Sequence, residues 1–361
     1  MKALILNSGS SSIKYKIFDM ESEKVLQKGI IEELKGNRHK ELEKIINSME
    51  KIDFIAHRVV HGGHSFKQAT IIDDNVIKEI DELSHLAPLH NPANLDGILT
   101  AKSLAPDTLQ VAVFDTAFHE DMPPSSYMYA IPQEMYTKYN IRRYGFHGTS
   151  HNYLLKECAK LLGKTLNETN IITLHLGNGA SAAAIKNGKS YDTSMGFTPL
   201  EGLVMGTRSG DFDPAILLYL LKLGFNAEEL DDLVNHKSGL KGICGSSDVR
   251  EILSRDDDDA KLALEIMSTR VKKYIGAYIA ILGRVDAIVF SGGIGENSAE
   301  VRAMILNGLD EAFGIFLDKE KNSMVQTQTA LISEEKSRIT LYVIPTDEEL
   351  EIAHQAFALL R

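Results

Sequence analysis

Cysteine is nearly absent from the 361 residues: only Cys158 and Cys244 occur, far apart and outside any paired motif. Two isolated cysteines exclude a disulfide framework and a zinc ribbon, and they are typical of a reducing compartment. Long hydrophobic runs are also missing, so the sequence predicts no membrane span. The apolar stretch after Met1 is too short for a signal peptide. We therefore expect a cytoplasmic protein.

Positive charge is in deficit, since 39 Lys and Arg residues face 50 Asp and Glu residues and the net charge is -11. This balance argues against nucleic acid or an anionic membrane as a partner. Any bound anion must then be held locally, by a few arginines and backbone amides. Hydrophobic residues make up 43% of the chain and charged residues 25%, which is ordinary for a globular protein. The length favours two domains over one.

Short β-branched runs alternate with segments of helical periodicity, which predicts the α/β class. The expected strands are residues 3–6, 13–18, 52–56, 110–114, 171–176, 287–290 and 341–344. The expected helices are residues 40–50, 153–162, 214–223, 260–282 and 299–307. Asp213 and Pro214 form a typical N-cap and first-residue pair for one of these helices.

One sequence pattern occurs twice. LILNSGSSSIKYKI and LHLGNGASAAAIKN both predict a strand, a loop of small residues and a second strand. Four residues of the first copy match four that lie 170 positions later: Leu4, Leu6, Gly9 and Ser11 with Leu174, Leu176, Gly179 and Ser181. Two glycine-rich hairpins can also arise by convergence. Duplication is the favoured interpretation, and it predicts a cleft between two similar halves.

Three segments are rich enough in small residues for backbone amides to approach a phosphate. They are Asn7–Ser12, which Lys14 follows, Gly177–Gly179, and Ser291–Ser298 with the sequence SGGIGENS. Each alone can be a plain tight turn, but three in one chain favour a nucleotide site. Gly163-Lys164-Thr165 is not a P-loop, because no glycine lies five residues before Gly163, which is better interpreted as a helix C-cap.

Two arginines occur among small residues, Arg58 in HRVVHGGH and Arg208 in MGTRSGD. A guanidinium in such a setting suits the charge that develops in phosphoryl transfer, although most arginines form surface salt bridges. Asp115 ends a predicted strand, where a carboxylate either faces the ligand crevice or caps the next segment. Glu348 also follows a strand and either binds magnesium or is an ordinary first-turn glutamate.

Histidines cluster at residues 57, 61 and 64, and again at residues 147 and 151. A spacing of four residues can place zinc ligands on one helical face. Both clusters contain glycines that disfavour a helix, and no HExxH motif is present. A zinc hydrolase is therefore the weaker interpretation. We interpret His147, in YGFHGTSH, as a donor or proton-linked group beside a phosphate, with a buried structural histidine as the alternative.

Eight blocks resemble the acetate kinase family in content and order: NSGSSSIKY, RVVHGG, FDTAFH, RRYGFHGTSH, HLGNGAS, TPLEGLVMGTRSGDFDP, GGIGEN and PTDEEL. They run nearly from end to end. This family belongs to the superfamily of acetate and sugar kinases, Hsp70 and actin. The resemblance implies two duplicated RNase H-like (actin-like ATPase) domains with an active-site cleft between them. Residues 1–119 with 350–361 would form the acid-substrate side, and residues 120–349 the nucleotide-binding domain.

The resemblance also implies roles for the matching residues. Catalytic roles fall to Asp115, Arg58, Arg208 and His147. Magnesium, which manganese can replace, would be held at Asn7 and Glu348. The acid would be bound by Arg58, Val60, Leu89, Phe146 and Pro199. The nucleotide would be bound by Lys14, His175, Leu176, Gly177, Asn178, Gly179, Asp248, Val249, Arg250, Gly293, Ile294, Gly295 and Asn297.

The implied reaction is direct in-line transfer of the γ-phosphoryl group of ATP to acetate, and a homodimer is the implied assembly. Propionate as the acid and pyrophosphate as the donor are alternatives. A nucleotide-gated module without kinase activity is another, but it should lack Arg58 and Arg208. Three features depart from the family pattern: a shortened segment between Asp19 and Arg58, a short tail beyond Glu349, and Asp347 in place of an asparagine.

Overall fold

The structure is a computed structural model that describes residues 1–10, 12–32, 37–49, 51–88 and 90–361. The chain forms two compact units. Unit 1 comprises residues 1–120, 146–153 and 347–361, and unit 2 comprises residues 121–145 and 154–346. This division differs from the expected one mainly at residues 146–153. They pack in unit 1 because Gly148 N donates a hydrogen bond of 3.0 Å to the main-chain oxygen of Asp115. The division into acid-binding and nucleotide-binding domains stays a prediction.

Unit 1 is built on a six-stranded sheet with the order β3-β2-β1-β4-β6-β5. Its strands are β1 (Lys2–Ser8), β2 (Ile13–Asp19), β3 (Lys24–Ile31), β4 (Phe54–Val59), β5 (Thr70–Ile71) and β6 (Leu109–Phe114). Strands β1, β4 and β6 are parallel neighbours, while β2, β3 and β5 run antiparallel to the strands beside them. The carboxyl ends of β1, β4 and β6 therefore meet at one edge of the sheet.

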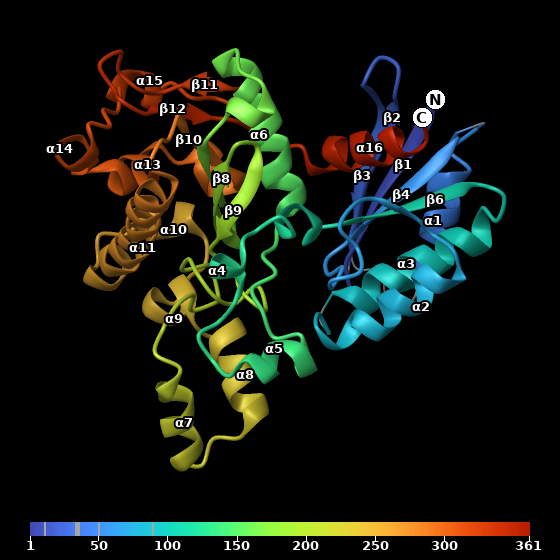
Figure 1. Ribbon diagram of the computed structural model, residues 1–361, viewed down its shortest axis with the longest axis horizontal. Coiled ribbons are helices and arrows are strands. Elements are labelled where there is room, and N and C mark those ends of the chain that lie inside the picture. The colour runs from blue at the N-terminus through green and yellow to red at the C-terminus, as the bar shows by residue number, and fades with distance from the viewer. Residues whose placement is uncertain (11, 33–36, 50, 89) are drawn as a thin grey trace. The chain divides into compact units, whose positions relative to one another are not determined.

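Helices cover both faces of this sheet (Figure 1). Along β1, Ala3 and Ile5 belong to the apolar core that includes α16 (Glu348–Leu359). Leu4 and Leu6 belong to the opposite core, which α1 (Arg38–Ile46) and α3 (Asn91–Leu104) cover. Successive side chains of a strand point to opposite faces, so a strand buried on both sides must be apolar throughout. The remaining long helix of the unit is α2 (Asp74–Glu82).

Unit 2 repeats this sheet. Its strand order, read from the other end, is β9-β8-β7-β10-β12-β11. The strands are β7 (Ile171–Leu176), β8 (Ala180–Lys186), β9 (Lys189–Thr193), β10 (Ala287–Ser291), β11 (Ala330–Leu331) and β12 (Thr340–Val343). Parallel and antiparallel pairs occur at the same places as in unit 1. The predicted α/β class and the predicted duplication are confirmed.

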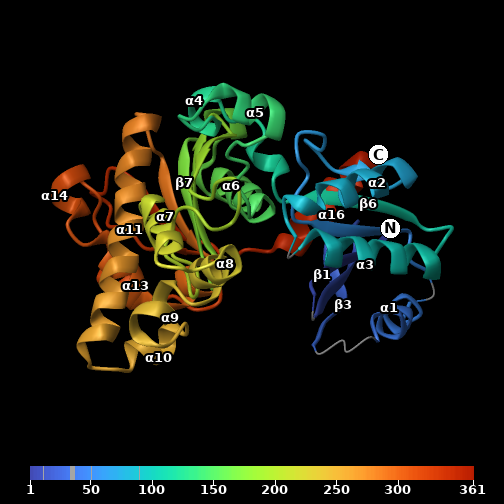
Figure 2. The same ribbon diagram turned by 90° about the horizontal axis from the view of Figure 1, so that it is seen from below.

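The helices of unit 2 are more numerous. They are α4 (Pro124–Tyr127), α5 (Gln133–Tyr139), α7 (Ala215–Lys222), α8 (Ala227–His236), α9 (Gly239–Cys244), α10 (Val249–Leu253), α11 (Asp258–Leu282), α12 (Gly292–Asn297), α13 (Ala299–Leu306), α14 (Leu309–Phe313) and α15 (Lys319–Ser323). The long α11 packs against β8, α9 and α13 (Figure 2). Helix α6 (Gly148–Leu162) begins in unit 1 and continues into unit 2. Among the described residues, no helix is both long and apolar enough to cross a membrane.

Candidate active site

Three of the predicted site residues lie at the shared edge of β1, β4 and β6. Asn7 is near the end of β1, Arg58 is the last residue but one of β4, and Asp115 directly follows β6. The register pairs Arg58 with Val113, and Asp115 N donates 3.0 Å to the oxygen of Val59. The sheet thus holds these side chains by backbone pairing.

The guanidinium of Arg58 joins the other two side chains. Its Nε donates to Asp115 Oδ1 over 3.1 Å, its Nη2 pairs with Oδ2 of the same carboxylate, and its Nη1 donates to Asn7 Oδ1 over 3.3 Å. Thr149, in the first turn of α6, donates its hydroxyl to Asp115 Oδ1 over 3.2 Å. Asp115 is completely buried, so its carboxylate does not face solvent, and the N-cap of the short helical segment that follows β6 is Thr116. Asp115 orients the arginine.

Burial and charge act against each other here. Burial raises the pKa of Asp115 above its ordinary value, although the positive charge of Arg58 opposes this shift. Burial would lower the pKa of Arg58, but the charges of Asp115 and Glu348 outweigh it and raise that pKa. Burial likewise raises the pKa of Glu348, again against Arg58. The single positive charge of Arg58 therefore faces the two carboxylates of Asp115 and Glu348. The remaining negative charge favours the binding of a further cation.

Glu348 is the first residue of α16, as a first-turn glutamate should be. Asp347 caps this helix by accepting 2.9 Å from Leu350 N, and it also pairs with Lys16 over 2.7 Å. Lys16 lies 3.2 Å from Glu349 as well. The extra charge that Asp347 brings in place of an asparagine is thus compensated by a lysine of β2.

The YGFHGTSH segment passes very close to Asp115. A Cβ on Gly148 would lie 2.1 Å from the main-chain oxygen of Asp115, so only glycine fits there. His147 has φ 56°, a left-handed conformation that is rare for a residue with a side chain. His147 is partly exposed and directly precedes Gly148 in the chain.

The predicted acid-pocket residues are spread over both units. Val60 and Phe146 are buried in unit 1, where the ring of Phe146 lies 5.7 Å from that of His61. Leu89 lies outside the described residues. Pro199 belongs to unit 2, and its oxygen accepts 3.4 Å from Nη1 of Arg208.

Arg208 differs from Arg58 in its surroundings. Its Nη1 contacts the oxygen of Pro199 and, at 3.8 Å, the sulfur of Met205. In the part of the chain that the structure describes, no carboxylate pairs with it. Burial lowers its pKa. A half-buried guanidinium with carbonyl and sulfur contacts retains its capacity to bind an anion.

A hollow of about 800 Å³ in unit 2 is large enough for a nucleotide. Eight of the residues predicted to bind nucleotide line it: Gly177, Asn178, Asp248, Val249, Arg250, Gly293, Ile294 and Asn297. Sequence reasoning missed Ser247, Leu253, Ser298 and Glu300. Ser298 ends the small-residue segment Ser291–Ser298 and Ser247 directly precedes Asp248, which is the signal that was available.

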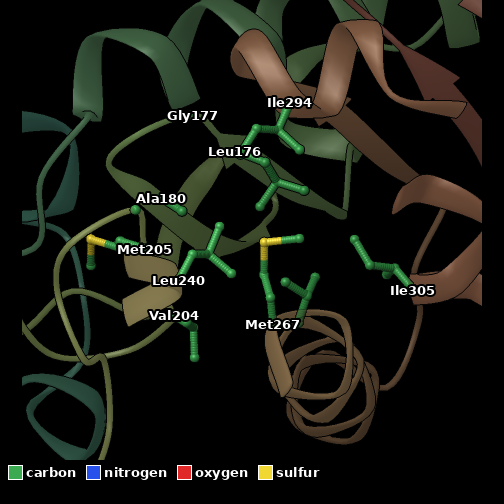
Figure 3. A pocket seen from close by; sticks show the side chains of 11 residues that line it. Leu176, Gly177, Ala180, Val204, Met205, Leu240, Met267, Ile294 and Ile305 are labelled. Atoms are coloured by element: carbon green, nitrogen blue, oxygen red, sulfur yellow. The ribbon is translucent and has the colours of Figure 1, made fainter. Parts of the chain in front are cut away.

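The other five predicted nucleotide residues lie elsewhere. Leu176 lines a small apolar cavity with Gly177 and Ile294, into which Leu240 and Met267 also project (Figure 3). His175, Gly179 and Gly295 do not line the hollow. Lys14 belongs to unit 1, where it is the β2 partner of Asn7 and its charge lowers the pKa of Glu348. The structure groups Lys14 with the predicted metal residues.

The GGIGEN segment forms a short helix, α12, and not a plain tight turn. Gly292 has φ 74°, and a Cβ there would lie 2.8 Å from the oxygen of Leu176. At Gly293, by contrast, a Cβ would meet nothing within 4 Å. Gly292 serves close packing, and Gly293 leaves the hollow open to a ligand. At its rim, a hydrogen bond from Arg250 lowers the pKa of Asp248 to about 2.

Comparison with known proteins gives consistent results over the whole chain. The model of the acetokinase family matches residues 2–48 and 37–354. The acetate kinase of Sulfurimonas denitrificans is 52% identical over 392 aligned positions, which cover 100% of both chains. Among solved structures, the acetate kinase of Porphyromonas gingivalis has 41% identity and a TM-score of 0.94, with 100% of both chains covered. A propionate kinase from Francisella tularensis has 41% identity and a TM-score of 0.91, with 98% of both covered.

The alignment with the Sulfurimonas protein is longer than the 361 residues of this chain, so that relative carries residues that this chain lacks. The two matched stretches of the family model overlap at residues 37–48, within the segment predicted to be shortened. The unit 1 sheet nevertheless has the six strands of the repeated topology. The shortening has removed none of them.

Proposed function

This chain belongs to the acetokinase family, and from this premise we propose that it is an acetate kinase. It transfers the γ-phosphoryl group of ATP to acetate, reversibly, and yields acetyl phosphate and ADP. The observation that carries the proposal is the guanidinium of Arg58, which Asp115 and Asn7 hold at the edge of the unit 1 sheet. The chain is also similar over its full length to acetate kinases.

The reaction needs little proton transfer. Acetate is ionised at neutral pH, so one of its oxygens attacks the γ-phosphorus directly while the bond to the bridging oxygen breaks and ADP leaves with the electron pair. Catalysis then depends on alignment and on neutralising charge. Arg58 would bind the acid and the transferring group, and Asp115 would fix the direction of its guanidinium. His147 would donate a hydrogen bond to a phosphate oxygen.

Asn7 and Glu348 fit a magnesium ion. Their amide and carboxylate oxygens are hard donors, and magnesium in kinases takes one or two protein ligands with water and phosphate oxygens. Among the described residues, no three acidic, histidine or cysteine side chains form a cluster that could hold a metal ion. A magnesium site of this kind does not need such a cluster. Burial raises the pKa of Glu348, and the neighbouring carboxylates Glu349 and Asp347 add to this shift. Magnesium, or manganese, would supply charge neutralisation on the phosphates.

We propose that the nucleotide occupies the hollow of unit 2, with Asn178 and Gly293 beside it. Arg208, which has no acidic partner among the described residues, would neutralise charge on the transferred group. Val60, Phe146 and Pro199 would limit the length of the acid, because a closed apolar pocket rejects added methylenes by steric clash.

Propionate is the second candidate acid. The solved propionate kinase is as similar to this chain in identity as the solved acetate kinase is. Values of kcat/KM for acetate, propionate and butyrate would decide between them, and a preference for butyrate would contradict both. A panel of ATP, GTP and pyrophosphate would identify the phosphoryl donor.

The decisive test of the activity traps the product. Purified protein, ATP, magnesium, acetate and hydroxylamine should yield acetohydroxamate, which forms a coloured complex with ferric iron. Omission of acetate or of magnesium is the control. No hydroxamate from either acetate or propionate would contradict the proposed function.

We further propose a cytoplasmic homodimer. Cys158 and Cys244 are both free and buried, which fits a reducing compartment. The helix α7 supports self-association, because large apolar side chains are exposed on it and just beyond it: Ile216, Leu218, Tyr219, Leu221, Leu223 and Phe225. It extends away from the sheet of its own unit (Figure 1). A helix that is apolar all round is normally covered by protein.

A further inference from the structure

Helix α3 presents three residues at intervals of three to the ends of the neighbouring strands. Asn91 and Asn94 are 0% and 3% exposed, and a Cβ on Gly97 would lie 2.4 Å from the hydroxyl oxygen of Ser8. Residues three apart lie on one face of a helix. This face therefore packs directly against the sheet edge that carries the candidate site.

The side-chain amide of Asn94 makes two buried hydrogen bonds, one to the last residue of β1 and one to the residue that follows β4. Its Nδ2 donates over 2.7 Å to the main-chain oxygen of Ser8, and its Oδ1 accepts over 3.1 Å from Val60 N. One partner is an acceptor and the other a donor, so only a group with both functions satisfies them. Ser8 follows Asn7 directly, and Val60 is two residues beyond Arg58.

The hydrogen bonds of Asn94 lie beyond the point where the sheet pairing of β1 with β4 ends. The pairing of β1 with β4 ends at Leu6 and His57, one residue short of Asn7 and Arg58. Beyond that point the contact between Arg58 and Asn7 is a single side-chain bond of 3.3 Å. The amide of Asn94 supplies the next cross-link between the two strand ends.

We infer that Asn94 is a positioning residue for the reaction. It fixes the distance between the predicted metal residue Asn7 and the acid-binding Arg58 by tying the backbones that carry them. The inference rests on the proposed function for its catalytic consequence, but the tie itself is a property of the fold. Small displacements of aligned groups cost large factors in rate.

Asn91 provides a matched control. It lies one turn earlier on the same face, it is equally buried, and it also makes two backbone hydrogen bonds of 3.0 Å. Both of its bonds go to one residue, His61, so it joins no second strand. Asn91→Leu and Asn94→Leu therefore remove the same number of hydrogen bonds from the same environment, and only the second breaks the link between β1 and β4.

The kinetic test compares these variants in the hydroxamate assay. Asn94→Leu should lower kcat about tenfold or more and raise the magnesium concentration for half-maximal rate. KM for ATP should stay within about twofold, because the nucleotide hollow lies in unit 2. Asn91→Leu should keep kcat within about threefold of the wild type. Equal losses in both variants, or an unchanged kcat in Asn94→Leu, would overturn the inference.

Two further measurements keep the test decisive. Asn94→Asp is the substitute if the leucine variant does not fold. It retains the acceptor for Val60 N and loses the donor to Ser8, so it should fold and give a kcat between those of the wild type and Asn94→Leu. Amide hydrogen exchange can be measured whether or not the variant is active. Asn94→Leu should speed exchange in peptides that cover residues 1–10 and residues 55–65, whereas Asn91→Leu should speed it only in the peptide that covers residues 55–65. Failure of the hydroxamate assay with the wild type would contradict the proposed function alone. Unchanged exchange at 1–10 in Asn94→Leu would contradict the tie itself.

Discussion

Arg58 and Asp115 face each other across the ends of β4 and β6 through a two-pronged ion pair, in which the carboxylate is completely buried. The geometry gives the two residues unequal tasks. Asp115 has no exposed surface with which to touch a substrate, whereas part of Arg58 remains exposed. If Arg58 binds the substrates as we propose, the aspartate acts through the arginine, and changes at the two positions should differ in their effects on stability and rate.

Arg58→Ala should reduce both activity and stability. Loss of the guanidinium removes charge neutralisation, for which we expect a fall in kcat of about 100-fold or more. It also leaves Asp115 buried without its cation, which costs roughly 3–5 kcal/mol. Urea unfolding and the hydroxamate assay measure the two effects. The double variant Arg58→Ala/Asp115→Asn should regain stability but no activity; a wild-type rate in either variant would contradict the mechanism.

Arg208→Ala should separate activity from stability. Its side chain has carbonyl and sulfur contacts but no carboxylate partner among the described residues. We expect the free energy of unfolding to change by less than about 1 kcal/mol. The value of kcat should fall about 100-fold or more if the guanidinium meets the transferring phosphoryl group. A large loss of stability would instead assign Arg208 a structural role.

Acid should destabilise unit 1 through buried histidines. Burial lowers the pKa of His57 to about 4, against a hydrogen bond of 2.8 Å with Gln110, and burial lowers that of His61 to about 3. The unfolded chain then binds these protons first, so stability falls as pH drops from about 6.5 towards 4. Each histidine contributes up to about 1.4 kcal/mol per pH unit. His57→Leu/Gln110→Leu should reduce this slope by one proton; an unchanged slope would contradict the assignment.

The sequence predicted most strands of the site, with ends within two residues of the observed ones except at β4. Apolar β-branched runs indicated β1, β6, β7, β10 and β12 within a few residues. The predicted strand at residues 52–56 ended too early, because His57 and Arg58 are polar. Pairing with Ala112 and Val113 of β6 extends it to Val59 and so fixes Arg58 in the sheet. Tertiary pairing of this kind is not visible in a local pattern.

Other features depended on distant partners. GGIGEN forms α12 partly because Glu296 accepts from Gly292 N over 2.9 Å and Arg302 donates to the oxygens of Gly295 and Glu296. Asn94 gave no signal in the sequence, since its partner Ser8 is 86 residues away. Asp248–Arg250, predicted from the family resemblance, line the hollow as one contiguous stretch, and their role in nucleotide binding stays a prediction.

Substitution of Gly293 should affect nucleotide binding alone. A Cβ at this position meets nothing within 4 Å and points into the space of the hollow. Gly293→Val should therefore fold normally and raise KM for ATP about tenfold or more by occupying nucleotide volume. Gly276→Ala is the control, because its Cβ would make ordinary contact with Phe313 at 3.8 Å within α11. An unchanged KM in Gly293→Val would place the nucleotide elsewhere.

The apolar surface of α7 should determine the oligomeric state. Leu218 and Tyr219 are 60% and 61% exposed, and apolar residues flank them along the helix. If a second copy covers this surface, Leu218→Glu/Tyr219→Glu buries two unpaired charges in the interface and should convert a dimer into monomers. Light scattering coupled to size exclusion measures the mass, and Lys222→Glu on the exposed end of the same helix controls for charge. A monomeric wild-type protein would contradict the proposed dimer. A dimer that survives the double substitution would show that α7 is not in the interface, because a buried apolar surface does not tolerate two unpaired carboxylates.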